Sequence, residues 1–338
     1  MDIKFESITH DEIKEFYECF NFEKTFLQDS AYGSFREKIG EEVFLFGAFS
    51  GKKLVGTVLI QKIRTRLKTF LHCPHGPLQL ETNTQESTIF WDNFLEFYKN
   101  LGKQEKCDFI RISPLIKPEN KTIFSKNRFI DAPIHLVNPE KTWILDISKD
   151  EDQLLKEMKK STRYEVRRIE KMGVSVEMGN IEKDLDIFWE LHSETVKRQK
   201  FVPFPKKNTK IELEIYGKNC QIFSAKLDNK FMSSSIILFD DKSAYYHQGA
   251  SLYSKAPVSY ATIWSAILEA KKRGCKEFNF WGVVGDKEKK HPWYGLSRFK
   301  RGFGGEERNY LHCQDFPITW KYWLNFCLEK YRKWKRGY

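Results

Sequence analysis

Several sequence features are missing from this chain of 338 residues. It contains no run of about 18 apolar residues, and its first residues lack the basic and then apolar segments of a secretory leader. Its seven cysteines are odd in number, scattered, and never form a C-x-x-C pair. We therefore expect no membrane-spanning helix, no disulfide framework and no zinc ribbon, and a cytoplasmic setting.

A metal centre is not expected either. The segment "LHCPHGP" gathers His72, Cys73 and His75. Alternate residues of a strand point to opposite faces, however, and no second group of ligands stands elsewhere in the sequence. We predict that the protein holds no metal and needs no other cofactor.

Aromatic and basic residues are abundant. With 41% hydrophobic and 15% aromatic residues, the chain can bury a core, and its length is typical of two domains. The 57 Lys and Arg against 46 Asp and Glu give a net charge of +11. This balance suits nucleic acid, a nucleotide-linked substrate or an anionic membrane, although a generally basic soluble protein would show it too.

One pattern occurs twice. "FGAFSGKKLVGTVLI" (Phe46 to Ile60) aligns without gaps on "FSAKLDNKFMSSSII" (Phe223 to Ile237), and each indicates two strands joined by a tight turn. A helix follows each hairpin, from Ile89 and from Thr262, with a glycine expected just past its end, and then another strand. The duplication predicts two similar α/β domains, unless two common hairpins resemble each other by chance.

A basic segment separates the two copies. "DEDQLLKEMKKSTRYEVRRIEKMGVSVEMG" indicates amphipathic helices that end near Gly173, before a strand. Such a run is often only a solvated face, but its cations are dense enough to contact phosphates. They are Lys159, Lys160, Arg163, Arg167, Arg168 and Lys171.

Six segments in this order carry a family resemblance. They are "FLQDSAYGSFREKIG", "CPHGPL", "STRYEVRRIEKMGV", "YYHQGAS", "GCKEFNFWGV" and "FKRGFGGE". On these segments the chain resembles the Fem aminoacyltransferases (FemA, FemB and FemX), over essentially its whole length. Those enzymes take amino acids from aminoacyl-tRNA and add them to the stem peptide of a peptidoglycan precursor.

The resemblance implies a fold, and the start of the basic segment between the two copies places the domain boundary near Asp146. We expect an α/β (α+β) protein of two tandem domains like the GNAT acyltransferases. The first domain would comprise residues 1–145 and the second 146–310, with 311–338 returning to the first. The coiled-coil arm of FemA and FemB has no counterpart, because no long heptad segment is present. The resemblance also implies peptidoglycan synthesis, cell-wall biogenesis and maintenance of cell shape.

Lys300 is our candidate catalytic residue. The resemblance points to "FKRGFGGE", and aminoacyl transfer needs a positive charge at the oxyanion or at the leaving ribose oxygen. We expect Phe299 to pack against the terminal adenosine or to orient the lysine. Gly302 and Gly304 would let the backbone approach the substrate. A core phenylalanine beside a solvated lysine remains the alternative.

Other residues are expected to bind the substrates. Arg36 replaces a family lysine and keeps its charge, and Arg198 matches a family arginine loosely; both are candidates for the precursor's diphosphate or carboxylates. Tyr245 and Tyr246 are the aromatic candidates, because Gln248 stands where the family often has an aromatic residue. The tRNA-binding candidates are Lys160, Arg163, Arg167 and Arg168.

No general base stands out. Where the family often has an acid before a proline, this chain has Ser113 in "RISP". Asp108, Asp286 and His247 are candidate proton acceptors, and deprotonation assisted by the substrate is equally compatible with the sequence.

Two other functions compete with aminoacyl transfer. A CoA-dependent N-acyltransferase on the same fold would need a Q/R-x-x-G-x-G/A loop, which neither copy has between strand and helix. A nucleic-acid-binding module without catalysis would explain the charge but not the paired halves. The expected partners are aminoacyl-tRNA and a nucleotide- or lipid-linked precursor, and we expect a monomer.

The C-terminal segment "DFPITWKYWLNFCLEKYRKWKRGY" combines apolar residues at helical spacing with many cations. The simpler interpretation is a packing helix with a basic tail. The other is that the tail beyond Tyr331 contacts the anionic inner face of the membrane.

Overall fold

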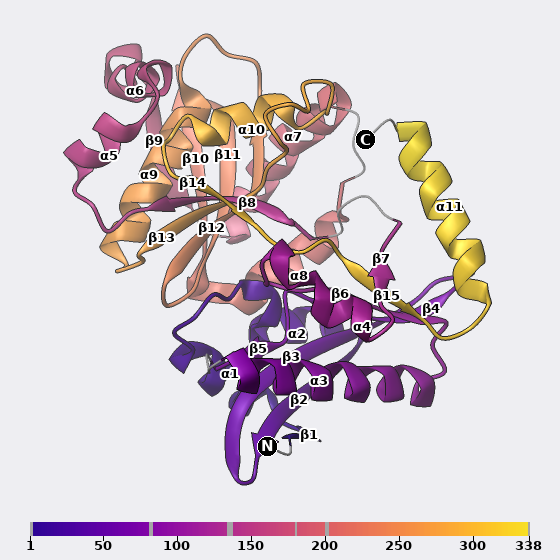
Figure 1. Ribbon diagram of the computed structural model, residues 1–338. Coiled ribbons are helices and arrows are strands. Elements are labelled where there is room, and N and C mark those ends of the chain that lie inside the picture. The colour runs from indigo at the N-terminus through magenta and orange to yellow at the C-terminus, as the bar shows by residue number, and fades with distance from the viewer. Residues whose placement is uncertain (1–2, 81–83, 134–137, 180, 200–202, 337–338) are drawn as a thin grey trace. The chain divides into compact units, whose positions relative to one another are not determined.

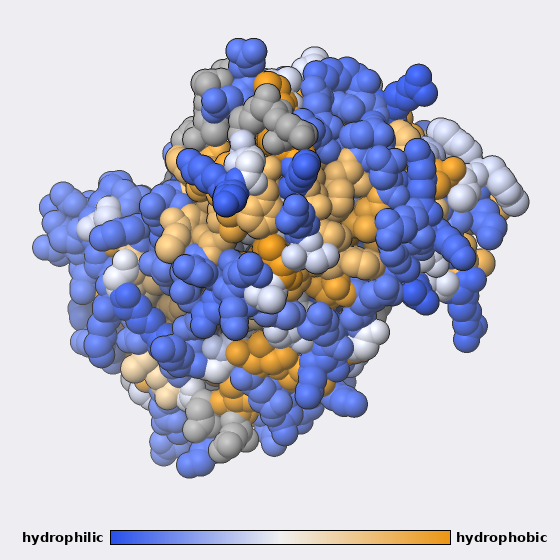
Figure 2. Space-filling view, turned by 90° about the horizontal axis from the view of Figure 1, so that it is seen from below, coloured by the Kyte–Doolittle hydropathy of each residue, from blue (hydrophilic) through white to orange (hydrophobic). Residues whose placement is uncertain are grey.

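The chain divides into two compact units, residues 1–140 with 309–338 and residues 141–308. The structure is a computed structural model that describes residues 3–80, 84–133, 138–179, 181–199 and 203–336 (Figure 1). Each unit is a mixed sheet with helices on its faces, as the sequence predicted. On the surface in Figure 2, hydrophilic residues predominate and hydrophobic ones gather in separate patches.

The first unit is built on a sheet of strand order β1-β2-β3-β4-β6-β15-β7, with β5 beside β3. Its strands are β1 (Ile3–Ser7), β2 (Glu42–Ser50), β3 (Lys53–Arg64), β4 (Thr69–Pro74), β5 (Leu78–Gln79), β6 (Phe109–Ser113), β7 (Ile130–Asp131) and β15 (Gln314–Pro317). Its helices are α1 (His10–Cys19), α2 (Ser30–Lys38), α3 (Thr84–Gln104), α4 (Thr122–Lys126) and α11 (Lys321–Arg336), with 3-10 turns η1 (Phe26–Gln28) and η2 (Pro118–Lys121). β4 and β6 run parallel.

The second unit repeats this plan in the order β14-β8-β13-β12-β11-β10-β9. Its strands are β8 (Lys141–Asp146), β9 (Ser175–Gly179), β10 (Cys220–Leu227), β11 (Lys230–Phe239), β12 (Ser243–Ser251), β13 (Glu277–Gly282) and β14 (Glu306–Asn309). Its helices are α5 (Glu151–Glu157), α6 (Lys160–Arg167), α7 (Ile181–Gln199), α8 (Lys206–Tyr216), α9 (Val258–Lys272) and α10 (Tyr294–Arg301), with 3-10 turns η3 (Glu170–Met172) and η4 (Gly217–Asn219). β12 and β13 form the parallel pair.

The duplicated hairpin is present in both units with the same register. Ala48 lies opposite Gly56 in β2–β3, and the aligned residues Ala225 and Ser233 lie opposite each other in β10–β11. A β-bulge follows the alanine in both copies. The turns use left-handed backbone at Gly51 and at Asp228-Asn229, as tight hairpin turns require.

Two boundaries differ from the sequence prediction. Gly102 does not follow the helix but lies inside α3, because a Cβ there would stand 2.5 Å from Ile110 of β6 and the helix needs that close approach. The proposed domain boundary after residue 145 falls within β8, and β8 pairs with β13 of the second unit. The end near Gly173 is confirmed, with that glycine at φ +69°.

The cores follow the strand alternation. In the first unit Leu71, Ile110 and Ile112 face the aromatic side chains of α3. Phe70 and Phe109, one residue out of phase, form a separate cluster with Tyr322 of α11. Because successive strand residues point to opposite faces, α3 and α11 cover opposite sides of the sheet.

Candidate active site

Lys300 is a buried residue of the second unit. It is only 5% exposed, near the end of α10, and its Nζ donates a 2.7 Å hydrogen bond to the carbonyl of Gly282. The ammonium lies 5.7 Å from the ring centroid of Tyr246. Lys300 is therefore not the solvated lysine of the alternative interpretation.

A local distortion of β13 presents the Gly282 carbonyl. Two residues of β13 oppose one residue of β8 between Asn279 and Gly282, which is a β-bulge. Within the bulge Trp281 has φ +63°, a conformation that bulky residues rarely adopt. The Asn279 side chain holds it by accepting the Trp281 N–H at 2.8 Å. Strain of this kind persists only where the surrounding structure imposes it, and it concentrates at functional sites.

Helix α10 is joined to the segment after β13 at two further points. The Val284 N–H donates to Ser297 Oγ at 3.0 Å, and Arg301 donates to the Val284 carbonyl at 2.6 Å. Ser297, Lys300 and Arg301 share the buried side of α10 because they are three and four residues apart. Lys300 is thus held in place by its neighbours on both sides.

Burial lowers the pKa of Lys300 to about 7. Among the described residues, no carboxylate pairs with its ammonium to oppose that effect. A lysine with such a pKa exists in both protonation states at neutral pH, so it can hold or release a proton during a reaction.

The two candidate tyrosines differ in their surroundings. Tyr246 lies beside Lys300, and burial raises its pKa to about 12, opposed by a hydrogen bond with Ser235. Its hydroxyl occupies the space in which a Cβ on Gly249 would stand. Tyr245 is 1% exposed and donates to Asp240 at 2.8 Å. The structure brings Tyr246, but not Tyr245, to the lysine.

Phe299 belongs to an aromatic cluster. Its ring centroid lies 5.0 Å from that of Tyr260 and 5.3 Å from that of Phe303. Phe299 is partly buried at the edge of the core. This packing fixes the direction of α10 and hence of Lys300.

Gly302 and Gly304 have a packing reason to be glycine. A Cβ on Gly302 would stand 2.2 Å from Thr162 Oγ1, and the Gly302 carbonyl accepts the Lys159 N–H at 2.9 Å. Gly304 has φ +89° and its carbonyl accepts from the indole of Trp143 at 2.6 Å. Both glycines let the chain after α10 pass close to its neighbours; their contact with substrate stays a prediction.

Arg198 lies at a surface pocket of about 330 Å³. It is exposed near the end of α7, and its guanidinium donates to the Ser251 carbonyl at 2.9 Å. Tyr260 lines the same pocket and contacts Phe299. The pocket therefore adjoins the aromatic cluster that positions Lys300.

The candidate tRNA-binding residues line α6. Thr162 and Val166 form its buried side, so Lys160, Arg163 and Arg167 project on the opposite side together with Tyr164, which is 61% exposed. Arg168, just after the helix, pairs with Glu165 at 2.8 Å and lies over the Tyr164 ring. On such a surface the cations can bind a nucleic-acid backbone, and the exposed aromatic ring can stack on a base.

Arg36 is in the first unit. Its Nε donates to Glu41 at 2.7 Å and its guanidinium lies over the rings of Tyr32 and Phe35. The Glu41 carboxylate already neutralises Arg36. A phosphate ligand would therefore have to share or replace that carboxylate.

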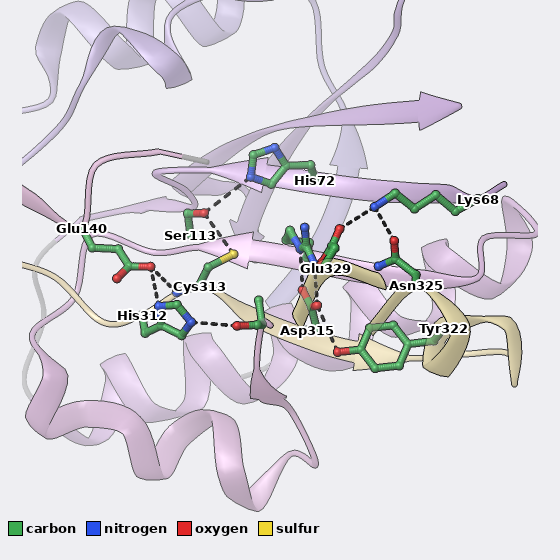
Figure 3. A network of polar contacts seen from close by, with 12 residues as sticks. Lys68, His72, Ser113, Glu140, His312, Cys313, Asp315, Tyr322, Asn325 and Glu329 are labelled. Carbon is green, nitrogen blue, oxygen red and sulfur yellow. Dashed lines mark hydrogen bonds and ion pairs between the residues drawn. The ribbon is translucent and has the colours of Figure 1, made fainter. Parts of the chain in front are cut away.

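The "LHCPHGP" segment is buried. His72 faces Ser113, whose hydroxyl contacts Cys313 at 3.3 Å (Figure 3). Burial lowers the pKa of His72 and of His75 to about 3 and raises that of Cys313 to about 12. At physiological pH the two imidazoles are therefore neutral, and Cys313 is a thiol rather than the reactive thiolate. Among the residues described, no group of three or more His, Cys, Asp and Glu could hold a metal ion.

The candidate proton acceptors have other partners. Asp108 accepts hydrogen bonds from the Thr69 N–H and the Thr319 hydroxyl. Asp286 lies 3.2 Å from Arg301, and His247 lies 3.0 Å from Glu212. None of the three is joined to Lys300 by a hydrogen bond in the described structure.

Sequence reasoning missed the bulge residues Asn279, Trp281 and Gly282. The segment "GCKEFNFWGV" contributes to the family resemblance, but neither its spacing nor its composition indicates a left-handed tryptophan. The pairing with β8 reveals the bulge, and the backbone angle of Trp281 reveals its left-handed conformation.

A family model and solved structures match the chain. The FemAB family model matches residues 134–236 and 205–330, together more than half of the chain. The chain belongs to the FemAB family. A structure of FemX superposes with a TM-score of 0.81 at 18% identity, covering 96% of this chain and all of that one.

Two further structures share the fold. A tandem GNAT protein from the clavulanic acid biosynthesis pathway has a TM-score of 0.59 at 9% identity and covers 94% of this chain and 98% of its own. L-PGS from Bacillus licheniformis has a TM-score of 0.53 at 12% identity, and the match covers 88% of this chain and 95% of that one. FemAB membership makes the chain an acyltransferase of cell-wall synthesis. No helix in the described ranges is long and apolar enough to cross a membrane.

Proposed function

We propose that this FemAB protein transfers an amino acid from aminoacyl-tRNA to an amine of the stem peptide of a peptidoglycan precursor. The observation that carries the proposal is Lys300, a buried lysine with a pKa of about 7 at a strained β-bulge. Amide formation from an ester needs a group that stabilises an oxyanion and manages one proton.

The reaction can be written around this lysine. The amine nitrogen attacks the ester carbonyl carbon, a C–N bond forms, and the carbonyl oxygen becomes an oxyanion. The ammonium form of Lys300 stabilises that charge and gives a proton to the ribose oxygen as the C–O bond breaks. The neutral amine of Lys300 then takes up the proton that the attacking nitrogen loses, which restores the ammonium and completes the proton balance. One such donor contributes roughly 3 to 4 kcal/mol to lowering the barrier.

The α6 surface supports an RNA donor. Lys160, Arg163 and Arg167 lie on one side of the helix with the exposed ring of Tyr164 among them. Cations spaced along one face neutralise backbone phosphates, and an aromatic ring can stack on a base. Because aminoacyl-tRNA is a cytoplasmic molecule, the proposal places the reaction in the cytoplasm.

The pocket beside α9 suits part of an anionic acceptor. Arg198, Ser251 and Tyr260 offer a guanidinium, a backbone segment and a phenol around about 330 Å³. A carboxylate or a phosphate of the precursor can accept hydrogen bonds from the guanidinium. Arg36 is a second candidate for such a group, in exchange with its present partner Glu41.

The competing function is acyl transfer from a coenzyme A thioester. The connection from β12 to α9, residues 252–257, contains no glycine. A pyrophosphate is commonly held there by backbone N–H groups of a glycine-containing loop. This difference supports the RNA donor, which needs no separate cofactor.

Mass spectrometry of the acceptor decides between the two donors. The protein is incubated with a muropeptide precursor and either a mixture of aminoacylated tRNAs or acetyl-CoA. We expect the mass of one aminoacyl residue to be added only with charged tRNA. Addition of an acetyl group alone would replace the proposal with the competing function.

Lys300→Met tests the catalytic role. We expect turnover to fall by at least about a hundredfold while the fold is kept, because one oxyanion donor is lost and side-chain bulk remains. The matched control is Arg298→Met, which removes an exposed charge from the same helix and should keep turnover within about threefold. A loss of less than threefold in Lys300→Met would remove Lys300 from the chemistry.

A further inference from the structure

Helix α11 has two opposite faces with different roles. One face is turned to the first unit and consists of Tyr322, Asn325, Phe326 and Glu329. The opposite face carries large exposed side chains, Trp323 (52%), Leu324 (62%), Tyr331 (55%) and Trp334 (77%). With Cys327 they fall within about 100° of the helix circumference and form one stripe. Trp320, just before the helix, is 70% exposed.

The inner face of α11 is fixed by ion pairs (Figure 3). Glu329 accepts from Lys68 at 2.6 Å and from Arg111 at 2.9 Å, and Lys68 also donates to Asn325. Tyr322 donates to Asp315 at 3.1 Å. Turning the stripe inward would break all of these contacts and leave buried charges without partners. The stripe is therefore held on the outside.

The surroundings of the stripe are positively charged. Lys321, Lys330, Arg332, Lys333 and Lys335 are exposed along α11. The single acidic residue between positions 321 and 336 is Glu329, on the inner face. Lys330 and Lys335 border the stripe at helical spacing, so the outer face combines tryptophan, tyrosine and leucine with cations and has no acid of its own.

We propose that α11 lies flat on an anionic lipid bilayer. Tryptophan and tyrosine favour the boundary between headgroups and acyl chains, leucine enters the acyl region, and lysines attract anionic headgroups. No described helix can span a bilayer, so α11 would lie parallel to the surface.

Two other occupants fit the stripe less well. In a dimer made by pairing two α11 stripes, the lysine-rich borders of both copies would face each other and repel. RNA would engage the cations and rings, but it offers no apolar environment for Leu324. Both remain as outcomes of the test below.

Binding of α11 to a bilayer would affect which form of the precursor the protein meets. If the proposed aminoacyl transfer holds, a protein held at the bilayer meets a lipid-linked precursor more often than a nucleotide-linked one. This consequence rests on the proposed function. Binding to vesicles itself does not, since it requires no turnover, so a failure of either idea can be recognised separately.

Vesicle sedimentation with the full chain tests the proposal. The vesicles contain phosphatidylcholine alone or an equimolar mixture with phosphatidylglycerol. We expect binding to the anionic vesicles only. Trp323→Ser/Trp334→Ser and Lys330→Glu/Lys335→Glu should each lower partitioning by on the order of tenfold or more. Circular dichroism and thermal melting check that both variants fold.

Matched controls change the same residue types elsewhere. Phe204→Ser removes an exposed aromatic ring (71%) from the second unit, and Lys289→Glu/Lys290→Glu reverses two exposed charges there. Both should bind anionic vesicles as the unchanged chain does. If the controls lose binding equally, general surface charge rather than α11 explains it, and the proposal fails.

Sedimentation velocity and tRNA binding complete the test. If the unchanged chain binds no vesicles and dimerises through Trp323 and Trp334, the stripe is a protein interface. If the α11 variants lose tRNA but keep vesicle binding, the stripe is an RNA surface. Either result overturns membrane docking. Selective loss of anionic vesicle binding, with tRNA affinity and monomeric mass unchanged, supports it.

Discussion

Among the buried cations of the two units, Arg111 of the first and Lys300 of the second stand in opposite electrostatic settings. Arg111 in the first unit is 2% exposed and contacts two carboxylates, Asp315 at 2.7 Å and Glu329 at 2.9 Å. Lys300 in the second unit is 5% exposed and donates to the carbonyl of Gly282. These two buried cations carry the same charge, but carboxylates neutralise Arg111, whereas Lys300 donates a hydrogen bond to a neutral carbonyl.

The pKa values follow this difference. Burial would lower the pKa of Arg111, but the attraction of Asp315 and Glu329 holds it above the ordinary arginine value. Burial lowers the pKa of Lys300 to about 7 without such opposition. The comparison teaches that the paired cation serves to join strands and helix, whereas the cation without a carboxylate is suited to changing its protonation state.

The largest expected effect comes from breaking the paired cation. Arg111→Met leaves Asp315 and Glu329 buried without their partner, which should lower the free energy of unfolding by about 3 to 5 kcal/mol. Urea unfolding at neutral pH measures this. Arg64→Met, which removes an exposed arginine of the same sheet, should change it by less than about 1 kcal/mol. Equal losses in both variants would contradict the comparison.

Acid should affect the first unit through its neutral histidines. His72 has a folded pKa of about 3 against an ordinary 6.5, so the unfolded chain binds more protons between these values. As the pH is lowered below 6.5, the free energy of unfolding should therefore decrease, by about 1.4 kcal/mol per pH unit for each such histidine.

His72→Gln removes one of these two contributions. When the pH is lowered from about 6.5 to about 4.5, the free energy of unfolding should drop in both proteins. The drop should be smaller in His72→Gln than in the unchanged chain, by about 2 to 3 kcal/mol. Urea titrations at the two pH values provide the measurement. An identical pH dependence in both proteins would mean that His72 does not stay neutral in the folded state.

Removing Lys300 should stabilise the second unit. The folded pKa of about 7 lies below the ordinary 10.5, so the unfolded chain binds more protons in this window and the free energy of unfolding rises with pH. Lys300→Met abolishes that rise. We expect a gain of about 1 to 3 kcal/mol at pH 7, after the loss of the hydrogen bond to Gly282 is included.

Urea unfolding at neutral and alkaline pH tests this sign. The advantage of Lys300→Met should shrink as pH approaches 10.5. A variant that is less stable than the unchanged chain at pH 7 would show that the lysine is a structural cation, like Arg111.

The smallest effect concerns the matched hairpins. Gly56 and Ser233 occupy the same place in the two copies. A Cβ on Gly56 would stand 2.6 Å from the Leu78 carbonyl and 2.8 Å from Phe90, so Gly56→Ser should destabilise the first unit by about 1 to 2 kcal/mol. Ser233→Gly should cost about 1 kcal/mol or less. Thermal melting of the two variants measures both losses, and Gly56→Ser should lower the melting temperature more than Ser233→Gly does.

Sequence predicted the repeated framework because local chemistry specifies it. Gly51 and Asp228-Asn229 favour the left-handed backbone of tight turns, and apolar alternation sets which side of each strand is buried. The basic side of α6 follows from helical spacing alone. The resemblance to the Fem enzymes likewise rested on short segments in a fixed order, and family membership is confirmed.

The site depended on contacts between distant segments. Arg301 and Lys300 are adjacent cations of one helix, and nothing local indicates that Arg301 pairs with Glu307 while Lys300 meets a carbonyl. The bulge that directs this carbonyl arises from the register of β13 against β8, strands that are more than a hundred residues apart in the chain.

What the sequence by itself determined is the pair of α/β halves, their turns, and the amphipathic faces of α6 and α11. The tertiary structure alone decided which cations are buried away from water and which of these form an ion pair with a carboxylate. The physical reason is that turns and helix faces depend on neighbours within a few residues, whereas a pKa depends on desolvation and on charges brought together by the whole fold. For this protein, that difference separates Arg111, which holds a helix, from Lys300, which can move a proton.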